Sequence, residues 1–406
     1  MTKTRNAPAI VSKPNSLDEH DSIGWSKSLP DDFYRHVSVN LKQATGVLSF
    51  VHAASLSFSQ LCDVAVRTSL STLIAGISIP AGYRGDKLSS ELKRQGLSRS
   101  QLQDAHNLYQ AELSQLTVVN AKRPRGVKGG EFVKVSWDSA YGHSVCQTDH
   151  YEQNERNRRV CAYHWKHDGK PRPTIIFLHG FAASTWGLNN YFMRVEEFYR
   201  RGYDVVLKTL PHHGARSGKG RLLSGFNYIS GGVHHLNHSV AQSTFDTRSL
   251  LDYLLRNSSG VKVGLCGMSL GGYTSALMAG LESRFEFVMP IVPIISIPDA
   301  MMAWRPLDKA ISKIVNDHHL DIPTLRDVMA AHSPLSFSPL LPPEKLMIVA
   351  GQGDRMALPH HAEALQKHWG DCELQWFRGS HVLPMQRERT LQAKFRFLEN
   401  IDFLAS

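Results

Sequence analysis

The stretch "LCGMSLGGYTSALMAG", Leu265–Gly280, places a serine between glycines, at the point where a strand-like run ends and a helix-like run begins. Before it, "VKVGLCG" is aliphatic, β-branched and short enough for a buried strand. After it, "SLGGYTSALMAGLESRF" contains helix formers and few helix breakers. We therefore expect Ser269 on a sharp turn between a strand and a helix, where Gly267 and Gly271 leave room for close packing.

Such a turn exposes the serine hydroxyl, which is a weak nucleophile until a base and an oxyanion-stabilising site accompany it. Gly-x-Ser-x-Gly alone also marks ordinary strand-to-helix turns. The strand before it and the helix after it favour the catalytic interpretation, in which the turn is a nucleophile elbow.

The candidate base and acid follow two later strand-like runs. Asp354 lies just beyond "KLMIVAG", and His381 lies just beyond "CELQWF". Ligands of open α/β sheets bind outside the carboxyl ends of the strands, so these positions favour catalytic roles. The chain order Ser269, Asp354, His381 is the order typical of elbow-type hydrolases. Asp371 is a rival acid, but it precedes its strand and should lie on the wrong side of the sheet.

The run "IIFLHGFAAS" predicts a further strand that ends at a glycine. We expect the backbone amides of Phe181 and Leu270 to face the developing oxyanion there. We interpret His179, in the same loop, as a structural residue. His212 and His213, in "LPHHGARS", and Arg216 could meet a polar substrate group, but the adjacent histidines are more simply interpreted as surface residues.

Composition limits the classes of protein to consider. The chain has 406 residues, of which 42% are hydrophobic and 20% charged, enough for one large core and a smaller appended unit. Five scattered cysteines without a Cys-x-x-Cys pair favour a reducing compartment. The N-terminal segment lacks the apolar core of a secretory signal, so we expect a cytoplasmic protein. The net charge of +10 allows weak association with an anionic membrane surface, but no aromatic and basic platform indicates nucleic-acid binding.

The pattern of polar and apolar residues divides the chain into three regions. Residues 1–35 are polar and aperiodic, which predicts a flexible tail. Residues 36–120 repeat apolar residues at spacings of three and four, which predicts an N-terminal helical lobe; Asp63 and Arg67 help to interrupt any membrane-spanning stretch. Residues 131–406 alternate strand-like and helix-like runs, which predicts an α/β fold with a mostly parallel, doubly wound sheet and helices on both faces.

Residues 294–343 lie between two predicted strands and are too many for a plain connection, so we expect a helical cap over the site. Met301, Met302 and Trp304 are candidates for lining a substrate pocket, because methionine adapts to irregular apolar shapes. Burial against the cap's own helices is an equally good interpretation. We expect the lobe and the cap to set substrate choice, while the core carries the chemistry.

From about residue 160 to its end, the chain resembles the α/β-hydrolase superfamily through "HGF", "LPHHGARS", "GMSLGG", "GQGDRMALP" and "GSH". The resemblance implies the α/β-hydrolase fold, with Ser269 as nucleophile, Asp354 as acid and His381 as base. It implies a serine esterase or lipase-like enzyme that cleaves a carboxylic ester or thioester through an acyl-enzyme. The serine argues against dehalogenase-like and epoxide-hydrolase-like members, which use aspartate, and against dienelactone-hydrolase-like members, which use cysteine.

Three alternatives remain open. An oligopeptidase-like amide hydrolase shares Gly-x-Ser-x-Gly-Gly, but the N-terminal region lacks the length and strand texture of a β-propeller. Several acyltransferases of this fold carry His-x-x-x-x-Asp, which this sequence lacks. A non-catalytic binding protein could keep the fold, but it would need none of the four catalytic elements. We expect no cofactor and no metal site, and the sequence does not indicate the oligomeric state or the substrate's acyl length.

Overall fold

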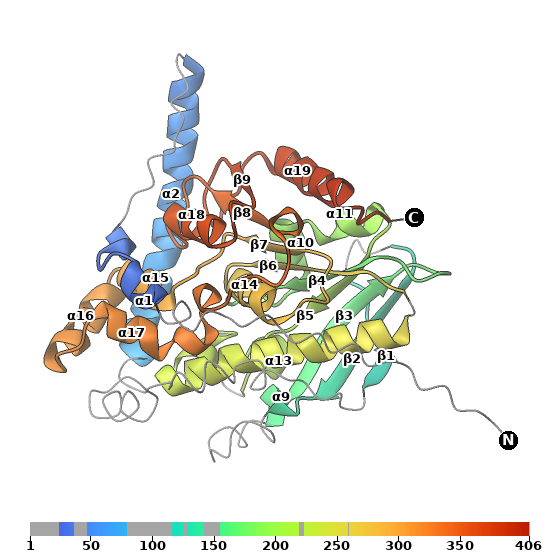
Figure 1. The fold of residues 1–406 in the computed structure, drawn as a ribbon, viewed down its shortest axis with the longest axis horizontal. Coiled ribbons are helices and arrows are strands. Elements are labelled where there is room, and N and C mark those ends of the chain that lie inside the picture. The colour runs from blue at the N-terminus through green and yellow to red at the C-terminus, as the bar shows by residue number, and fades with distance from the viewer. Residues whose placement is uncertain are drawn as a thin grey trace.

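The computed structural model describes residues 24–35, 47–78, 116–124, 128–141, 155–218, 223–258 and 260–405. These residues form one sheet of nine strands in the order β1-β2-β3-β5-β4-β6-β7-β8-β9 (Figure 1). Neighbours from β5 to β9 pair in parallel, whereas the pairs β1–β2, β2–β3 and β3–β5 are antiparallel. The predicted mostly parallel α/β sheet is confirmed.

The strands are β1 (Thr117–Asn120), β2 (Glu131–Asp138), β3 (Arg159–Lys166), β4 (Thr174–Leu178), β5 (Asp204–Lys208), β6 (Val263–Met268), β7 (Val288–Ile291), β8 (Met347–Gly351) and β9 (Glu373–Phe377). The α-helices of the described residues are α1 (Trp25–Ser28), α2 (Val47–Leu73), α9 (Glu155–Arg158), α10 (Trp186–Met193), α11 (Val195–Arg200), α12 (Phe226–Ile229), α13 (Val233–Asn257), α14 (Leu270–Leu281), α15 (Ile297–Met302), α16 (Leu307–Asp317), α17 (Ile322–Val328), α18 (Pro359–His368) and α19 (Arg387–Asn400).

Helices cover both faces of the sheet because the central strands are apolar on both faces. Every residue of β4 is buried. Its Ile176 and Leu178 pack in one core cluster with residues of α13, α14 and α18. The alternate residues Ile175 and Phe177 pack in a second cluster with residues of α10, α11 and α19. Strands buried on both faces appear in sequence as continuous apolar runs, which is why their positions could be predicted.

Two elements differ from the sequence expectation. The sequence of residues 186–201 predicts one helix, but the structure has two, α10 and α11, because Arg194 between them adopts the left-handed conformation with φ 60°. Thr117–Asn120, at the end of the region expected to be helical, is an edge strand that pairs with β2. Within that region the structure describes α2 and a π-helical turn over Ile74–Ser78, while residues 79–115 lie outside the described residues.

Residues 24–35 differ from the flexible tail expected over 1–35. Trp25 and Phe33 are buried, and the Trp25 indole donates a hydrogen bond of 2.8 Å to the Ser336 hydroxyl. Arg326, fully buried on α17, donates to Asp299 and to three backbone carbonyls of this segment, those of Ser26, Leu29 and Pro30. Polar composition did not indicate this docking, because the segment binds Arg326 through backbone carbonyls and buries only a few apolar side chains, among them Trp25 and Phe33. Residues 1–23 lie outside the described residues.

The helices α15, α16 and α17 occupy the chain between β7 and β8, where a cap is expected. In Figure 1, α2 lies on the same side of the molecule as these helices, and one of its ends extends beyond the rest. No helix within the described ranges is both long and apolar enough to cross a bilayer.

Candidate active site

Ser269 lies between β6, which ends at Met268, and α14, which begins at Leu270. Its backbone has φ 54° and ψ −112°, a region that non-glycine residues rarely adopt. A β-carbon added to Gly267 would lie 2.1 Å from the Gly271 carbonyl oxygen, and one added to Gly271 would lie 2.2 Å from the Leu178 carbonyl oxygen. Both glycines are therefore needed to bring α14 against the sheet, and the turn presents a partly exposed Ser269.

His381 and Asp354 are paired at the carboxyl ends of β9 and β8. The distance between His381 Nδ1 and an Asp354 carboxylate oxygen is 2.8 Å, and both residues are buried. The other Asp354 oxygen accepts hydrogen bonds from the backbone amides of Met356 and Ala357, at 2.8 and 2.7 Å. These bonds fix the carboxylate, so the pairing orients the imidazole with Nδ1 as the donor and Nε2 free to accept.

Burial and charge act in opposite directions on this pair. Burial alone lowers the pKa of His381, but the Asp354 charge, its hydrogen bond and the Asp63 charge outweigh burial and raise that pKa above the ordinary 6.5. Burial raises the pKa of Asp354, and its attraction to His381 offsets this only in part. The raised pKa of His381 favours an imidazole that readily accepts a proton near neutral pH.

The rival acid Asp371 is placed where the sequence reasoning expected it. It lies in the turn before β9, at the amino end of that strand, and it is exposed. It is therefore at the opposite edge of the sheet from His381, which follows β9.

Ser269 and His381 line one cavity of about 640 Å³, together with Phe181 and Leu270. Met301 and Trp304 also line this cavity, whereas Met302 is buried and does not belong to its lining. The rest of the wall is mostly apolar. It includes a row of residues from α2 and the turn after it: Ala65, Val66, Ser69, Leu70, Leu73 and Ile74.

Two buried histidines, His179 and His213, contact the loop after β4. His179 donates from Nδ1 to the Gly180 carbonyl at 2.8 Å, and its Nε2 accepts from the Leu210 amide at 3.0 Å. Burial lowers the pKa of His179 to about 4, so the ring is neutral and has the structural role that we expected. The His213 ring lies edge-on to Phe181, with 5.5 Å between ring centroids.

The interpretation of His212 and His213 as surface residues is wrong. Both are buried, with burial as the largest cause of their lowered pKa values, and Arg216 is fully buried as well. Arg216 pairs with the equally buried Asp246 at 2.8 Å and donates to the carbonyls of Asn157 and Thr209. His212, His213 and Arg216 thus stabilise the loop after β5 by packing beneath it in the interior. None of these three side chains lines the 640 Å³ cavity.

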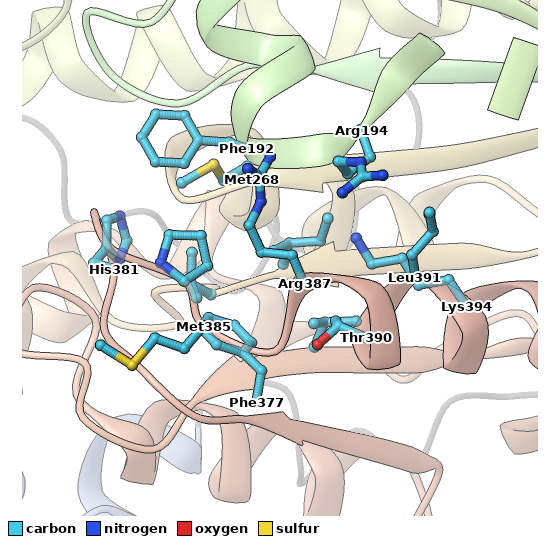
Figure 2. A pocket seen from close by; sticks show the side chains of 14 residues that line it. Phe192, Arg194, Met268, Phe377, His381, Met385, Arg387, Thr390, Leu391 and Lys394 are labelled. Atoms are coloured by element: carbon cyan, nitrogen blue, oxygen red, sulfur yellow. The ribbon is translucent and has the colours of Figure 1, made fainter. Parts of the chain in front are cut away.

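A second, smaller cavity of about 30 Å³ adjoins His381 (Figure 2). Phe192, Met268 and His381 line both cavities. The small cavity also has three cationic side chains in its lining: Arg194, Arg387 and Lys394. Its volume holds no more than a water molecule or two, so it is not the substrate pocket.

Sequence reasoning missed Asp63. This residue lies on α2, is fully buried, and accepts a hydrogen bond of 2.9 Å from the backbone amide of His381. The only available signal was a carboxylate in the otherwise uncharged stretch "SFSQLCDVAV", which we used solely against a membrane span.

His234 and His238 stand four residues apart on α13, a spacing that metal-binding helices use. His238 Nδ1 lies 2.7 Å from the Tyr141 hydroxyl. Within the residues that the structure describes, no group of three or more His, Cys, Asp and Glu side chains is arranged to hold a metal ion.

Comparisons with known sequences find relatives for part of the chain. No family model matches the chain. Two uncharacterised proteins from two strains of Mycobacterium tuberculosis are 30% identical over 234 residues, which is 56% of this chain and 53% of theirs. The chain thus spans about half the length of the curated relatives it matches.

Two solved structures are similar over most of the chain. Acetyl xylan esterase 1 from Thermoanaerobacterium sp. matches with a TM-score of 0.51 and 15% identity, covering 80% of this chain and 97% of the esterase. An acetyl xylan esterase from Paenibacillus sp. R4 matches with a TM-score of 0.51 and 14% identity, covering 75% and 94%. Together with the strand order and the Ser269 turn, these matches show that the chain has the α/β-hydrolase fold.

Proposed function

We propose that this protein is a serine hydrolase that cleaves carboxylic esters of apolar acyl groups through an acyl-enzyme. The observation that carries the proposal is one apolar cavity that contains both Ser269, on its strained turn, and His381, which is tied to Asp354. The two solved esterases named above support ester hydrolysis as the reaction class, although the likeness itself is one of fold.

In this mechanism His381 Nε2 takes the proton from the Ser269 hydroxyl as the oxygen attacks the ester carbonyl carbon. The backbone amides of Phe181 and Leu270 donate to the resulting oxyanion. Leu270 is the first residue of α14, so its amide has no partner within the helix and is free for this role. His381 then protonates the leaving alcohol, and a water molecule activated by the same imidazole releases the acid from Ser269.

The shape and chemistry of the cavity support an apolar acyl group. Its volume of about 640 Å³ lies within the usual range of small-molecule sites, about 300 to 1,000 Å³. Met301 and Trp304, together with Leu70 and Leu73 of α2, offer apolar surface to a chain whose carbonyl carbon lies at Ser269.

The test combines active-site labelling with a panel of substrates. A fluorophosphonate probe should label the native protein and not Ser269→Ala. A series of p-nitrophenyl esters and matching thioesters, from acetyl to palmitoyl, should be hydrolysed by the native protein with a preference for chains beyond acetyl. Equal labelling of both proteins would place the nucleophile elsewhere. Labelling without turnover of any ester, but with amide cleavage or acyl transfer to an added alcohol, would replace ester hydrolysis by that reaction.

A further inference from the structure

Asp63 connects α2 to both loops that carry the proposed acid and base. One carboxylate oxygen accepts from the backbone amides of Arg355 and His381, each at 2.9 Å. The other oxygen accepts from the backbone amide of Val382 at 2.9 Å. Arg355 follows Asp354 directly in the chain, so a single buried carboxylate binds the backbone beside the acid and at the base.

Further contacts place α2 against the same two loops. Ser380 donates from its hydroxyl to the Ser59 carbonyl at 2.8 Å, and Arg67 donates to the Arg355 carbonyl at 2.9 Å. A β-carbon on Gly353 would lie 2.6 Å from a methyl carbon of Leu56, so the helix and the loop after β8 are in close contact. These contacts fix α2 against the two loops, so the backbone of Asp63 is held in place as well as its carboxylate.

A buried carboxylate is costly unless hydrogen bonds and nearby charges compensate for its lost hydration. Three backbone N–H donors are a strong form of compensation, and each of these bonds is charge-assisted. Removing the acceptor would leave the amides of the buried His381 and of the half-buried Val382 without their partner. We therefore expect the positions of the two loops to depend on the hydrogen bonds to Asp63 as well as on side-chain packing.

We propose that Asp63 is a positioning residue for the reaction: its carboxylate holds the loops after β8 and β9 in register, so that His381 stays aligned between Asp354 and Ser269. This inference rests on the proposed function. It also makes α2 part of the active site, and not only a wall of the substrate cavity.

The charge of Asp63 acts on the imidazole as well as on the backbone. Among the residues that the structure describes, the anionic groups that act on His381 are Asp354 and Asp63, and both raise the pKa of His381 against the effect of burial. Arg67 and Arg355 lie beside Asp63. The cationic residues that line the small cavity next to His381 are Arg194, Arg387 and Lys394 (Figure 2).

The decisive variant is Asp63→Asn, which keeps the side-chain shape but removes the charge and one acceptor. The full-length variant should show kcat lowered about 10- to 100-fold with KM changed less than about threefold, because misalignment affects the transition state more than binding. The acidic limb of its kcat/KM profile should move to lower pH, because the pKa of His381 loses one of its two raising charges. A merely structural role would lower the melting temperature without moving that limb.

Ser71→Ala is the matched control. Ser71 is equally buried on α2 and donates to the Arg305 carbonyl, away from the two loops and outside the cavity lining. It should lose stability yet keep kcat and the pH profile of the native protein. Asp63→Glu, which keeps the charge but lengthens the side chain, should keep the acidic limb and lose kcat. It decides the question if Asp63→Asn does not fold.

Two outcomes separate this inference from the proposed function. If the native protein shows no hydrolysis that depends on Ser269, the proposed function fails. If native hydrolysis depends on Ser269, but the folded Asp63 variants keep kcat within about twofold and an unmoved acidic limb, the role of Asp63 alone is overturned.

Discussion

Replacing Asp354 by asparagine tests the proposed acid with little disturbance of the fold. One oxygen of Asp354 accepts from the amides of Met356 and Ala357, and an asparagine carbonyl oxygen can keep both bonds. The asparagine NH2 group then faces His381 Nδ1, where it can only donate. The imidazole must accept at Nδ1 and carry its proton on Nε2, so it cannot take the proton from Ser269.

The expected loss in kcat is about 10⁴-fold, the size measured for this substitution in a serine protease triad, which corresponds to about 5 kcal/mol in activation free energy. Stability should change far less. The variant replaces three charge-assisted hydrogen bonds, those with His381, Met356 and Ala357, by neutral ones, but it also relieves the burial of a carboxylate whose pKa burial already raises. A large loss of activity in a protein that still melts cooperatively is therefore expected.

The assay is steady-state hydrolysis of an activated ester, together with the rate of fluorophosphonate labelling and a thermal melt. Asp371→Asn is the matched control, because Asp371 is exposed and has φ 58°, a conformation that asparagine adopts readily. The control should keep native activity. Asp354→Asn with activity within tenfold of native, or a loss confined to Asp371→Asn, would refute the assignment of the acid.

Three further outcomes are expected. The kcat/KM of the native protein should fall on the acidic side with an apparent pKa above 6.5, because His381 acts as a base only when neutral and its pKa is raised; a pH titration of the rate with an acidic limb below about pH 6 would contradict this. Trp304→Ala should move the preferred acyl length upward in the ester panel while acetyl esters are still hydrolysed, since Trp304 lines the cavity; an unchanged preference would show that this wall does not contact the chain. Arg326→Met should lower the free energy of unfolding in urea by about 3 to 5 kcal/mol, because it leaves Asp299 buried without its cation; adding Asp299→Asn should recover part of that loss, and additive losses would contradict the pairing.

Parts of the site could be predicted because sheet topology determines them. β8 and β9 are adjacent parallel strands, with Gly351 opposite Phe377, so residues that follow them emerge at the same edge. Asp354 and His381 each follow one of these strands, and their hydrogen bond agrees with that reasoning. The turn at Ser269 was predictable for a similar reason, because Gly267 and Gly271 have local steric requirements that are visible in sequence.

Burial of polar residues could not be predicted in the same way. His212, His213 and Arg216 are polar types in a predicted loop, and only the packing around them shows that they are inside. Their burial depends on partners far along the chain: Arg216 pairs with Asp246 of α13. A polar residue satisfied by a distant partner has the same local sequence signal as one satisfied by water.

Asp63 changes the separate roles that the sequence analysis assigned to the N-terminal region and to the α/β core. Sequence reasoning gave the region before residue 120 a part in substrate choice alone, because it contains no nucleophile, base or acid that the mechanism lacks. The structure shows that α2, through the Asp63 carboxylate, also accepts a hydrogen bond from the backbone amide of His381, and that it lines the cavity through Leu70 and Leu73. In the proposed mechanism the element that contacts the acyl chain is thus the element that aligns the base. Any interaction that favours the docked position of α2 then also favours the aligned arrangement, by the reciprocity that holds between coupled equilibria. If both proposals hold, we expect acyl-chain binding at this wall to contribute to the alignment of His381 as well as to the affinity for substrate.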